Sequence, residues 1–256
     1  MQDLFTLKGR TALITGGSRG IGRMIAEGFL SQGAKVYISA RKAGPCEETA
    51  KELSKIGTCI ALPLDASGAD GAKKMAARYL EHEKTLDILV NNAGAAWGAD
   101  FDEFPESGWD KVMNLNLKTP FYLTQALHGA LKAAASKEKL AKVINIASID
   151  GIAVNPQETY SYHASKAGLI HLTKRMAMRL IRDNIVVSAI APGAFASDMN
   201  RDARDHGDAL SKVIPSRRIG TAEDMAGAAI FLASRAGDYV VGSTLIVDGG
   251  VSHMRG

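Results

Sequence analysis

The chain has 256 residues, of which 46% are apolar, enough for one domain with a sizeable core. A net charge of +4, spread without a basic block, argues against nucleic acid as a partner. Cys46 and Cys59 have neither a redox-motif spacing nor metal-ligand neighbours, and we predict neither a leader peptide nor a membrane-spanning segment. We therefore expect a single domain over residues 1–256, cytoplasmic and without a metal.

Short runs rich in Val, Ile and Leu alternate with longer stretches of helical period, which is typical of parallel strands joined by helical crossovers. We predict an α/β fold, a doubly wound parallel sheet of the Rossmann type with about seven strands. The strands are expected at residues 11–15, 35–40, 59–64, 87–91, 142–147, 185–190 and 244–247, with helices between them. The least regular segment, 200–220, is interpreted either as a solvated loop or as a mobile lid.

A glycine-rich loop, TGGSRGIG, directly follows the first predicted strand and precedes a helix-compatible stretch. Gly16, Gly20 and Gly22 stand where a strand must turn, where backbone must approach a pyrophosphate, and where helix must pack on sheet. Backbone amides at the helix N-terminus would hold the phosphate charge. The loop therefore predicts a dinucleotide site rather than a turn without a ligand.

The end of the second strand separates NAD from NADP, because an acid there bonds a free ribose 2′-hydroxyl and repels a 2′-phosphate. The chain has VYISARK at this point, with Ala40 instead of an acid and Arg41 after it. Arg41 and Arg19 of the glycine loop can grip one phosphate together; the alternative is a pair of solvated charges. We predict that the cofactor is NADPH/NADP.

Tyr162 and Lys166 are four residues apart in YSYHASKAGLIHLT, so on a helix they share one face. A phenol is a poor acid–base catalyst at neutral pH, but a nearby ammonium favours its anion and lowers its pKa. We expect Lys166 to lower the pKa of Tyr162 in this way. Tyr160 is not the expected acid, because the position four residues after it is Ala164.

These motifs, with NNAG at 91–94, NLNL at 114–117, VINIAS and APG, resemble in order those of the short-chain dehydrogenase/reductase family over nearly the whole chain. The resemblance implies that Tyr162 protonates a carbonyl oxygen that Ser148 orients, while hydride arrives from the nicotinamide. It further implies that Lys166 also holds the nicotinamide ribose and that Asn116 keeps a water in a proton path. The stretch between Ser148 and Tyr162 is one residue longer than is common in the family.

The same resemblance implies the cofactor contacts. They are Gly16, Ser18, Arg19, Gly20, Ile21, Arg41, Asp65, Ala66, Asn92, Gly94, Tyr162, Lys166, Pro192, Gly193, Phe195 and Ser197. Asp65 corresponds to the acidic residue near the adenine ring. Ser197 stands where threonine is usual and keeps the hydroxyl.

Within the family, the motifs resemble most those of 3-oxoacyl-(acyl-carrier-protein) reductases. This implies reduction of a β-ketoacyl thioester, carried on acyl-carrier protein or coenzyme A, to the (R)-3-hydroxyacyl product in lipid synthesis. Apolar loop residues are candidate walls of the substrate site or, equally, ordinary packing: Ala95, Ala96, Trp97, Ile152, Ala153, Val154, Phe195 and Met199. An acidic carrier would need a basic surface, for which Arg175, Arg179, Arg182, Lys137 and Lys139 are candidates unless they are simply solvated.

Two other functions stay open. One keeps the chemistry but acts on another alcohol, ketone, steroid or sugar, and the other is a non-catalytic NADP-binding scaffold. The helix expected at 167–181 is apolar on more than one side, and the resemblance implies a homotetramer, or a dimer along that helix.

Overall fold

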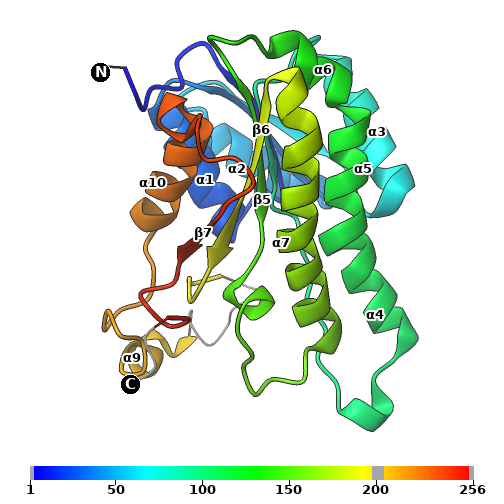
Figure 1. The fold of residues 1–256 in the computed structure, drawn as a ribbon, viewed down its shortest axis with the longest axis vertical. Coiled ribbons are helices and arrows are strands. Elements are labelled where there is room, and N and C mark those ends of the chain that lie inside the picture. The colour runs from blue at the N-terminus through cyan, green and yellow to red at the C-terminus, as the bar shows by residue number, and fades with distance from the viewer. Residues whose placement is uncertain (1–2, 198–204, 254–256) are drawn as a thin grey trace.

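The computed structural model describes residues 3–197 and 205–253. It contains a seven-stranded sheet in the order β3-β2-β1-β4-β5-β6-β7, in which each neighbouring pair is parallel. Helices cover both faces of the sheet (Figure 1). The predicted α/β class and the doubly wound parallel sheet are confirmed.

The strands lie close to their predicted positions. They are β1 (Thr11–Thr15), β2 (Lys35–Ala40), β3 (Cys59–Pro63), β4 (Ile88–Asn91), β5 (Ala141–Ile146), β6 (Ile185–Pro192) and β7 (Thr244–Val247). The bounds of β1, β2 and β7 agree with the prediction, and the other strands differ by one or two residues at an end. All residues of β4, β5 and β6 are buried, which explains their uninterrupted apolar runs.

The helices of the crossovers are α1 (Gly20–Ser31), α2 (Ala43–Leu53), α3 (Gly68–Leu80), α4 (Glu106–Met113), α5 (Thr119–Ala126), α6 (His128–Ala134), α7 (Tyr160–Leu180), α9 (Gly207–Ser211) and α10 (Ala222–Ala233). Shorter helical turns are η1 (Phe101–Glu103), η2 (Asn114–Lys118), η3 (Ile149–Gly151), η4 (Ile181–Asp183) and η5 (Arg235–Gly237). Within the segment predicted as a loop or lid, the described part forms α9, and the choice between the two interpretations stays open.

Two apolar cores lie on opposite faces of the sheet, because alternate residues of a strand point to opposite sides. Ala12 and Ile14 of β1 join the core that contains residues of α1, α2 and α10. Leu13 between them joins the core formed with α3, α5, α6 and α7. Figure 1 shows the same division, with α1 and α10 on one side of the sheet and α3, α5 and α7 on the other.

The order of the strands reverses between β1 and β4, since β2 and β3 follow β1 on one side while β5, β6 and β7 extend the sheet on the other. In open parallel sheets, ligands bind outside the carboxyl ends of the strands at such a point. The loops that follow β1, β4, β5 and β6 are therefore the ones that can build a site. No helix in the part of the chain that the structure describes is long and apolar enough to cross a membrane.

Candidate active site

The glycine loop after β1 makes a tight turn into α1. Gly16 and Gly20 have φ angles of 65° and 51°, in the left-handed region that favours glycine. A Cβ on Gly22 would lie 2.3 Å from the Gly16 carbonyl oxygen, so only glycine fits at this position. The Asn92 side chain, after β4, donates to the carbonyl oxygens of Thr15 (2.9 Å) and Gly16 (3.1 Å). The turn is therefore fixed to the neighbouring strand at the point where the strand order reverses.

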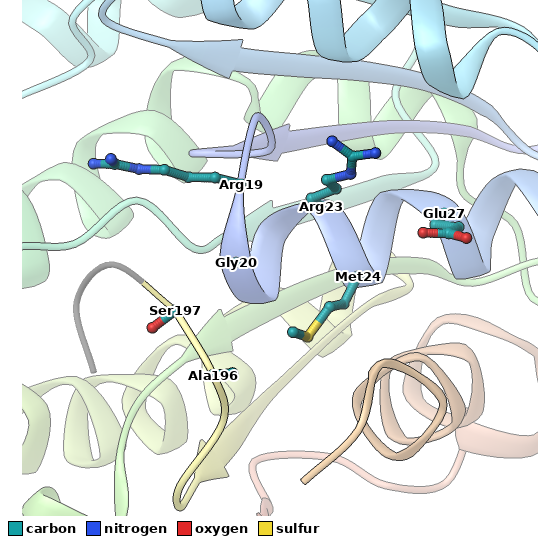
Figure 2. Close-up of a pocket in the computed structure, with 7 residues that line it drawn as sticks. All are labelled: Arg19, Gly20, Arg23, Met24, Glu27, Ala196 and Ser197. Atoms are coloured by element: carbon teal, nitrogen blue, oxygen red, sulfur yellow. The ribbon is translucent and has the colours of Figure 1, made fainter. Parts of the chain in front are cut away.

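The first turn of α1 borders a cavity of about 300 Å³. It is lined by Arg19, Gly20, Arg23, Met24, Glu27, Ala196 and Ser197 (Figure 2). The N-cap residue Arg19 forms no side-chain cap hydrogen bond, so the helix end presents backbone amides that suit an anion. Three predicted cofactor residues, Arg19, Gly20 and Ser197, line this cavity together. Figure 2 shows the segment with Ser197 running beneath the start of α1.

The glycine loop also contacts the end of β2, where the cofactor preference is set. The Gly17 amide donates to the Ser39 carbonyl oxygen (3.0 Å), and the Thr49 hydroxyl of α2 donates to the Ser18 carbonyl oxygen (3.0 Å). Arg41 is exposed directly beyond β2. The basic side chain and the phosphate-binding type of turn thus lie on adjacent strands at the same edge of the sheet.

Asp65 and Ala66 follow β3 at the same edge. The Asp65 carboxylate accepts a hydrogen bond from the Ser67 amide (2.9 Å), which leaves the exposed side chain in a defined turn. Ala66 is buried, and its carbonyl oxygen accepts from the Thr119 hydroxyl (3.2 Å). This order at the end of β3 suits a residue that contacts an adenine ring from the side, and the cofactor roles of both residues stay predictions.

Tyr162, Lys166 and Ser148 meet between β5 and α7. The Ser148 side chain lies near enough to the Tyr162 phenol to lower the pKa that the phenol would otherwise have. The Lys166 ammonium lies over the tyrosine ring, with Nζ 5.5 Å from the ring centroid, and it donates to the Ile146 carbonyl oxygen (2.7 Å). The helix thus places the phenol and the ammonium on one face, as their spacing predicts, and β5 supplies the serine.

Asn116 belongs to η2, a π-helical turn that joins α4 to α5. Its side-chain oxygen accepts from the Ala95 amide (2.8 Å), and its amide nitrogen donates to the Ala95 carbonyl oxygen (2.9 Å) and the Ser165 hydroxyl (3.1 Å). A Cβ on Gly94 would lie 3.4 Å from Asn116 Oδ1 and 3.8 Å from Lys166 Nζ. Gly94 therefore lies between the asparagine and the lysine, and all four predicted catalytic residues gather in one place. Such π-helical turns are frequent at functional sites.

The expected effect of Lys166 on the phenol is wrong for this structure. Burial raises the pKa of Tyr162 to about 12, and the Ser148 side chain offsets only part of that rise. Burial also lowers the pKa of Lys166 to about 8. The ammonium lies over the face of the ring and donates to the Ile146 carbonyl oxygen.

The extra residue between Ser148 and Tyr162 does not displace the serine. The backbone turns at once into η3, where the Asp150 amide donates to the Ser148 hydroxyl (3.1 Å). A Cβ on Gly151 would lie 2.6 Å from the Lys166 carbonyl carbon, so this turn packs directly on the backbone of α7. The sequence analysis did not identify Asp150 and Gly151, because contacts between a loop and a helix leave no periodic signal in a sequence.

Three predicted cofactor residues, Pro192, Gly193 and Phe195, lie at the end of β6 and just beyond it. Pro192 ends the strand, and a Cβ on Gly193 would lie 2.7 Å from Asp248 Cβ, which leaves room only for glycine. Phe195 is 2% exposed, and its ring lies where a Cβ on Gly220 would be. Its side chain is therefore packed in the core, which favours ordinary packing over a substrate wall for this residue, and a cofactor contact would come from its backbone.

The other candidate substrate walls differ in exposure. Val154 is 91% exposed and Ile152 44% exposed, whereas Trp97 packs against Gly108 and lies 5.1 Å from the Lys111 ammonium. The open apolar surface thus lies on the segment after η3. Met199 lies outside the described residues.

Tyr160, the alternative acid, points elsewhere. Its ring packs edge-on against the rings of Phe101 and Phe104, with 5.5 Å and 5.6 Å between the ring centroids. Its hydroxyl donates a hydrogen bond to the Glu158 carboxylate (3.0 Å). These contacts agree with the choice of Tyr162.

The basic residues of α7 are exposed, as a docking surface requires. Arg179 also pairs with Asp183 (2.7 Å), and Lys139 pairs with the buried Asp87 (2.5 Å). Arg175 and Arg182 are exposed. Part of the predicted basic surface is thus already neutralised within the chain.

Comparison with known proteins places this geometry in a family. The family model described as Enoyl-(Acyl carrier protein) reductase matches residues 16–252. The chain therefore belongs to the short-chain dehydrogenase/reductase family, and it has the fold of an oxidoreductase of that family.

Individual relatives match almost end to end. A Pseudomonas aeruginosa protein named "Rhamnolipids biosynthesis 3-oxoacyl-[acyl-carrier-protein] reductase" is 47% identical over 253 residues, covering 98% of this chain and 99% of the relative. The solved structure "Pseudomonas aeruginosa RhlG/NADP active-site complex" superposes with a TM-score of 0.94 at 46% identity, covering 98% of this chain and 100% of that one. A gluconate 5-dehydrogenase from Burkholderia cenocepacia, in complex with NADP and tartrate, superposes with a TM-score of 0.90 at 33% identity, covering 99% of each chain.

Proposed function

We propose that the protein uses NADPH to reduce a β-ketoacyl thioester to the (R)-3-hydroxyacyl product, in a lipid synthesis of the rhamnolipid type. The observation that carries the proposal is the meeting of Ser148, Tyr162 and Lys166 beside the glycine turn. The name of the relative at 47% identity supports the acyl thioester.

The glycine turn fits a dinucleotide. A Cβ on Gly22 would clash with the Gly16 carbonyl oxygen, so the turn stays tight, and α1 begins without a side-chain cap. Arg19 at the turn and Arg41 beyond β2 supply positive charge for a 2′-phosphate. NADPH, when bound, supplies the hydride. The NADP complexes among the solved relatives support this choice.

The remaining steps belong to the protein's own side chains. Tyr162 donates its phenolic proton to the carbonyl oxygen, and Ser148 donates a hydrogen bond that orients this oxygen. Burial keeps the pKa of Tyr162 high, so the phenol holds its proton until negative charge develops on the substrate. Lys166 would hold a hydroxyl of the bound cofactor with its ammonium, and Asn116 would position the path by which a proton returns.

The cytoplasmic location, the homo-oligomer and the carrier protein stay predictions within this proposal. An acidic acyl-carrier protein would meet Arg175 on α7 and Arg182 on η4, where the charge is exposed. Coenzyme A remains the alternative carrier.

Reduction of a sugar acid is the second candidate, since relatives named 2-dehydro-3-deoxy-D-gluconate 5-dehydrogenase, such as that of Bacillus subtilis, are 37% identical. A test follows NADPH oxidation by absorbance with acetoacetyl thioesters and, in parallel, with 5-keto-D-gluconate. NADH and the variant Tyr162→Phe serve as controls. Turnover of the thioester that prefers NADPH and disappears in the variant supports the proposal, and turnover of the sugar acid alone replaces it. NADPH binding without any turnover would favour the non-catalytic scaffold.

A further inference from the structure

Asp150 is a carboxylate that the mechanism above does not use, and it lies two residues after Ser148. Its backbone amide donates to the Ser148 hydroxyl (3.1 Å), and its side-chain oxygen accepts from the Asn155 amide (2.8 Å). The residue is partly buried. Hydrogen bonds therefore fix both the backbone and the side chain of Asp150, which keeps the carboxylate from turning into solvent.

The turn that carries Asp150 is pressed onto the catalytic helix. A Cβ on Gly151 would lie 2.6 Å from the Lys166 carbonyl carbon and 2.8 Å from the Ala167 amide nitrogen. The Asp150 amide lies 3.1 Å from the Ser148 hydroxyl, so Asp150 borders the space around that hydroxyl. The carbonyl that Ser148 and Tyr162 hold would also occupy that space.

The charge of Asp150 acts on both groups of the catalytic helix. Burial raises the pKa of Tyr162, and Asp150 adds to this rise because it opposes a second negative charge. Burial lowers the pKa of Lys166, and Asp150 partly offsets this fall because it favours the ammonium. The field at the reacting carbonyl is thus more negative than the catalytic residues alone would make it.

We propose that Asp150 is a specificity-determining residue that repels substrates with a carboxylate near the reacting carbonyl and so selects neutral β-ketoacyl groups. This inference rests on the proposed function and deepens it, because a thioester is neutral where a sugar acid or a free β-keto acid is charged.

The test uses a neutral and an anionic substrate that share the acetoacetyl group. The neutral one is the acetoacetyl thioester of N-acetylcysteamine, and the anionic one is acetoacetate. For wild type, Asp150→Asn and Asp150→Glu, kcat/KM is measured for each, and the quantity compared is the ratio of the anionic to the neutral value. Asp70→Asn, at an exposed position of α3, is the control for the loss of one negative charge.

We expect the ratio to rise about tenfold in Asp150→Asn, since like charges a few ångströms apart in a protein site repel by about that factor or more. The ratio should stay near the wild-type value in Asp150→Glu, which restores the charge, and in Asp70→Asn. Added salt should raise the ratio of the anionic to the neutral kcat/KM in the wild type, because ions screen the repulsion between partly exposed charges.

A change of the same factor for both substrates in Asp150→Asn would assign Asp150 a purely structural role and overturn the proposal. An unchanged ratio would overturn it too. If Asp150→Asn does not fold, as thermal melting would reveal, the salt dependence of the wild-type ratio decides, and its absence counts against the proposal.

Failure of the proposed function is a separate outcome. A wild type that does not reduce the thioester refutes the proposed substrate class. The ratio of the anionic to the neutral kcat/KM is then measured with 5-keto-D-gluconate as the anionic substrate and a neutral ketose as the other.

Discussion

Asn145 donates a hydrogen bond from its side-chain amide to the Thr173 hydroxyl (2.9 Å), which joins the middle of β5 to α7. Both residues are 0% exposed. The Asn145 side-chain oxygen in turn accepts from the Asn91 amide of β4 (2.9 Å). This buried polar chain fixes α7 against the sheet about two turns after Lys166, and so supports the placement of the catalytic pair.

Removing the acceptor of that bond should destabilise the protein. Thr173→Val keeps the shape of the side chain but leaves the buried Asn145 donor without a partner, which costs about 1–3 kcal/mol. Urea unfolding measures this loss. Thr173→Ser keeps the hydroxyl and should retain most of the stability, and equal losses in the two variants would contradict the role given to the hydrogen bond.

Loss of the phenolic proton donor should reduce turnover without loss of the fold. For Tyr162→Phe we expect kcat to fall by about 10²–10⁴-fold, the usual contribution of general acid catalysis. NADPH binding, followed by nicotinamide fluorescence, should change little. A variant that keeps its turnover would show that another group protonates the substrate.

The buried Lys166 makes stability depend on pH. Its pKa is lowered from 10.5 to about 8, so between these values the unfolded chain binds a proton that the folded chain has released. Stability therefore rises with pH through this window. Above pH 10 the raised pKa of Tyr162 acts in the opposite direction, because the unfolded phenol ionises first.

The comparison of wild type with Lys166→Met isolates this contribution. The difference in the free energy of unfolding, wild type minus variant, should become more positive from about pH 8 to about pH 10. Urea titrations at the two pH values measure it. A difference independent of pH would mean that Lys166 is charged in the folded protein throughout the range.

The preference for NADPH should depend on Arg41. We expect Arg41→Ala to raise the KM for NADPH by about tenfold or more, as for the loss of one charge-assisted hydrogen bond, and to leave the KM for NADH nearly unchanged. Lys51→Ala, at an exposed position of α2, is the control for a lost positive charge. Equal effects on both cofactors would point to a role in folding instead.

Glycine at position 22 should be essential for the turn. A Cβ there would lie 2.3 Å from the Gly16 carbonyl oxygen, so Gly22→Ala must move the glycine loop and should weaken NADPH binding as well as cost about 1–3 kcal/mol of stability. At Gly44 of α2, a Cβ meets nothing within 4 Å. Gly44→Ala should therefore be harmless, and a similar loss in both variants would contradict the steric argument.

Much of the fold was predictable because parallel strands covered on both faces leave short, mostly apolar runs, as in β5 and β6. The glycine loop and the pair of Tyr162 and Lys166 were predictable for a similar reason, since each depends on a short local spacing. The π-helical turn at Asn116 was not, because a local widening of a helix that continues from α4 into α5 has no residue pattern of its own.

The electrostatic properties of the site could not be predicted from the sequence either. The spacing correctly placed Lys166 near Tyr162 but did not reveal that the ammonium lies over the ring, or that burial dominates the pKa of the phenol. Asp150 was missed because its importance comes from the contact of its neighbour with α7.

The hydrogen bonds of Asn116 have a mechanical consequence. They hold the backbone after β4, at Ala95, to the start of α7, at Ser165, and so join two walls of the cleft into one rigid unit that includes the acid. A substrate cannot enter by moving these walls apart without breaking several buried hydrogen bonds. We therefore expect this side of the site to stay rigid when a substrate binds.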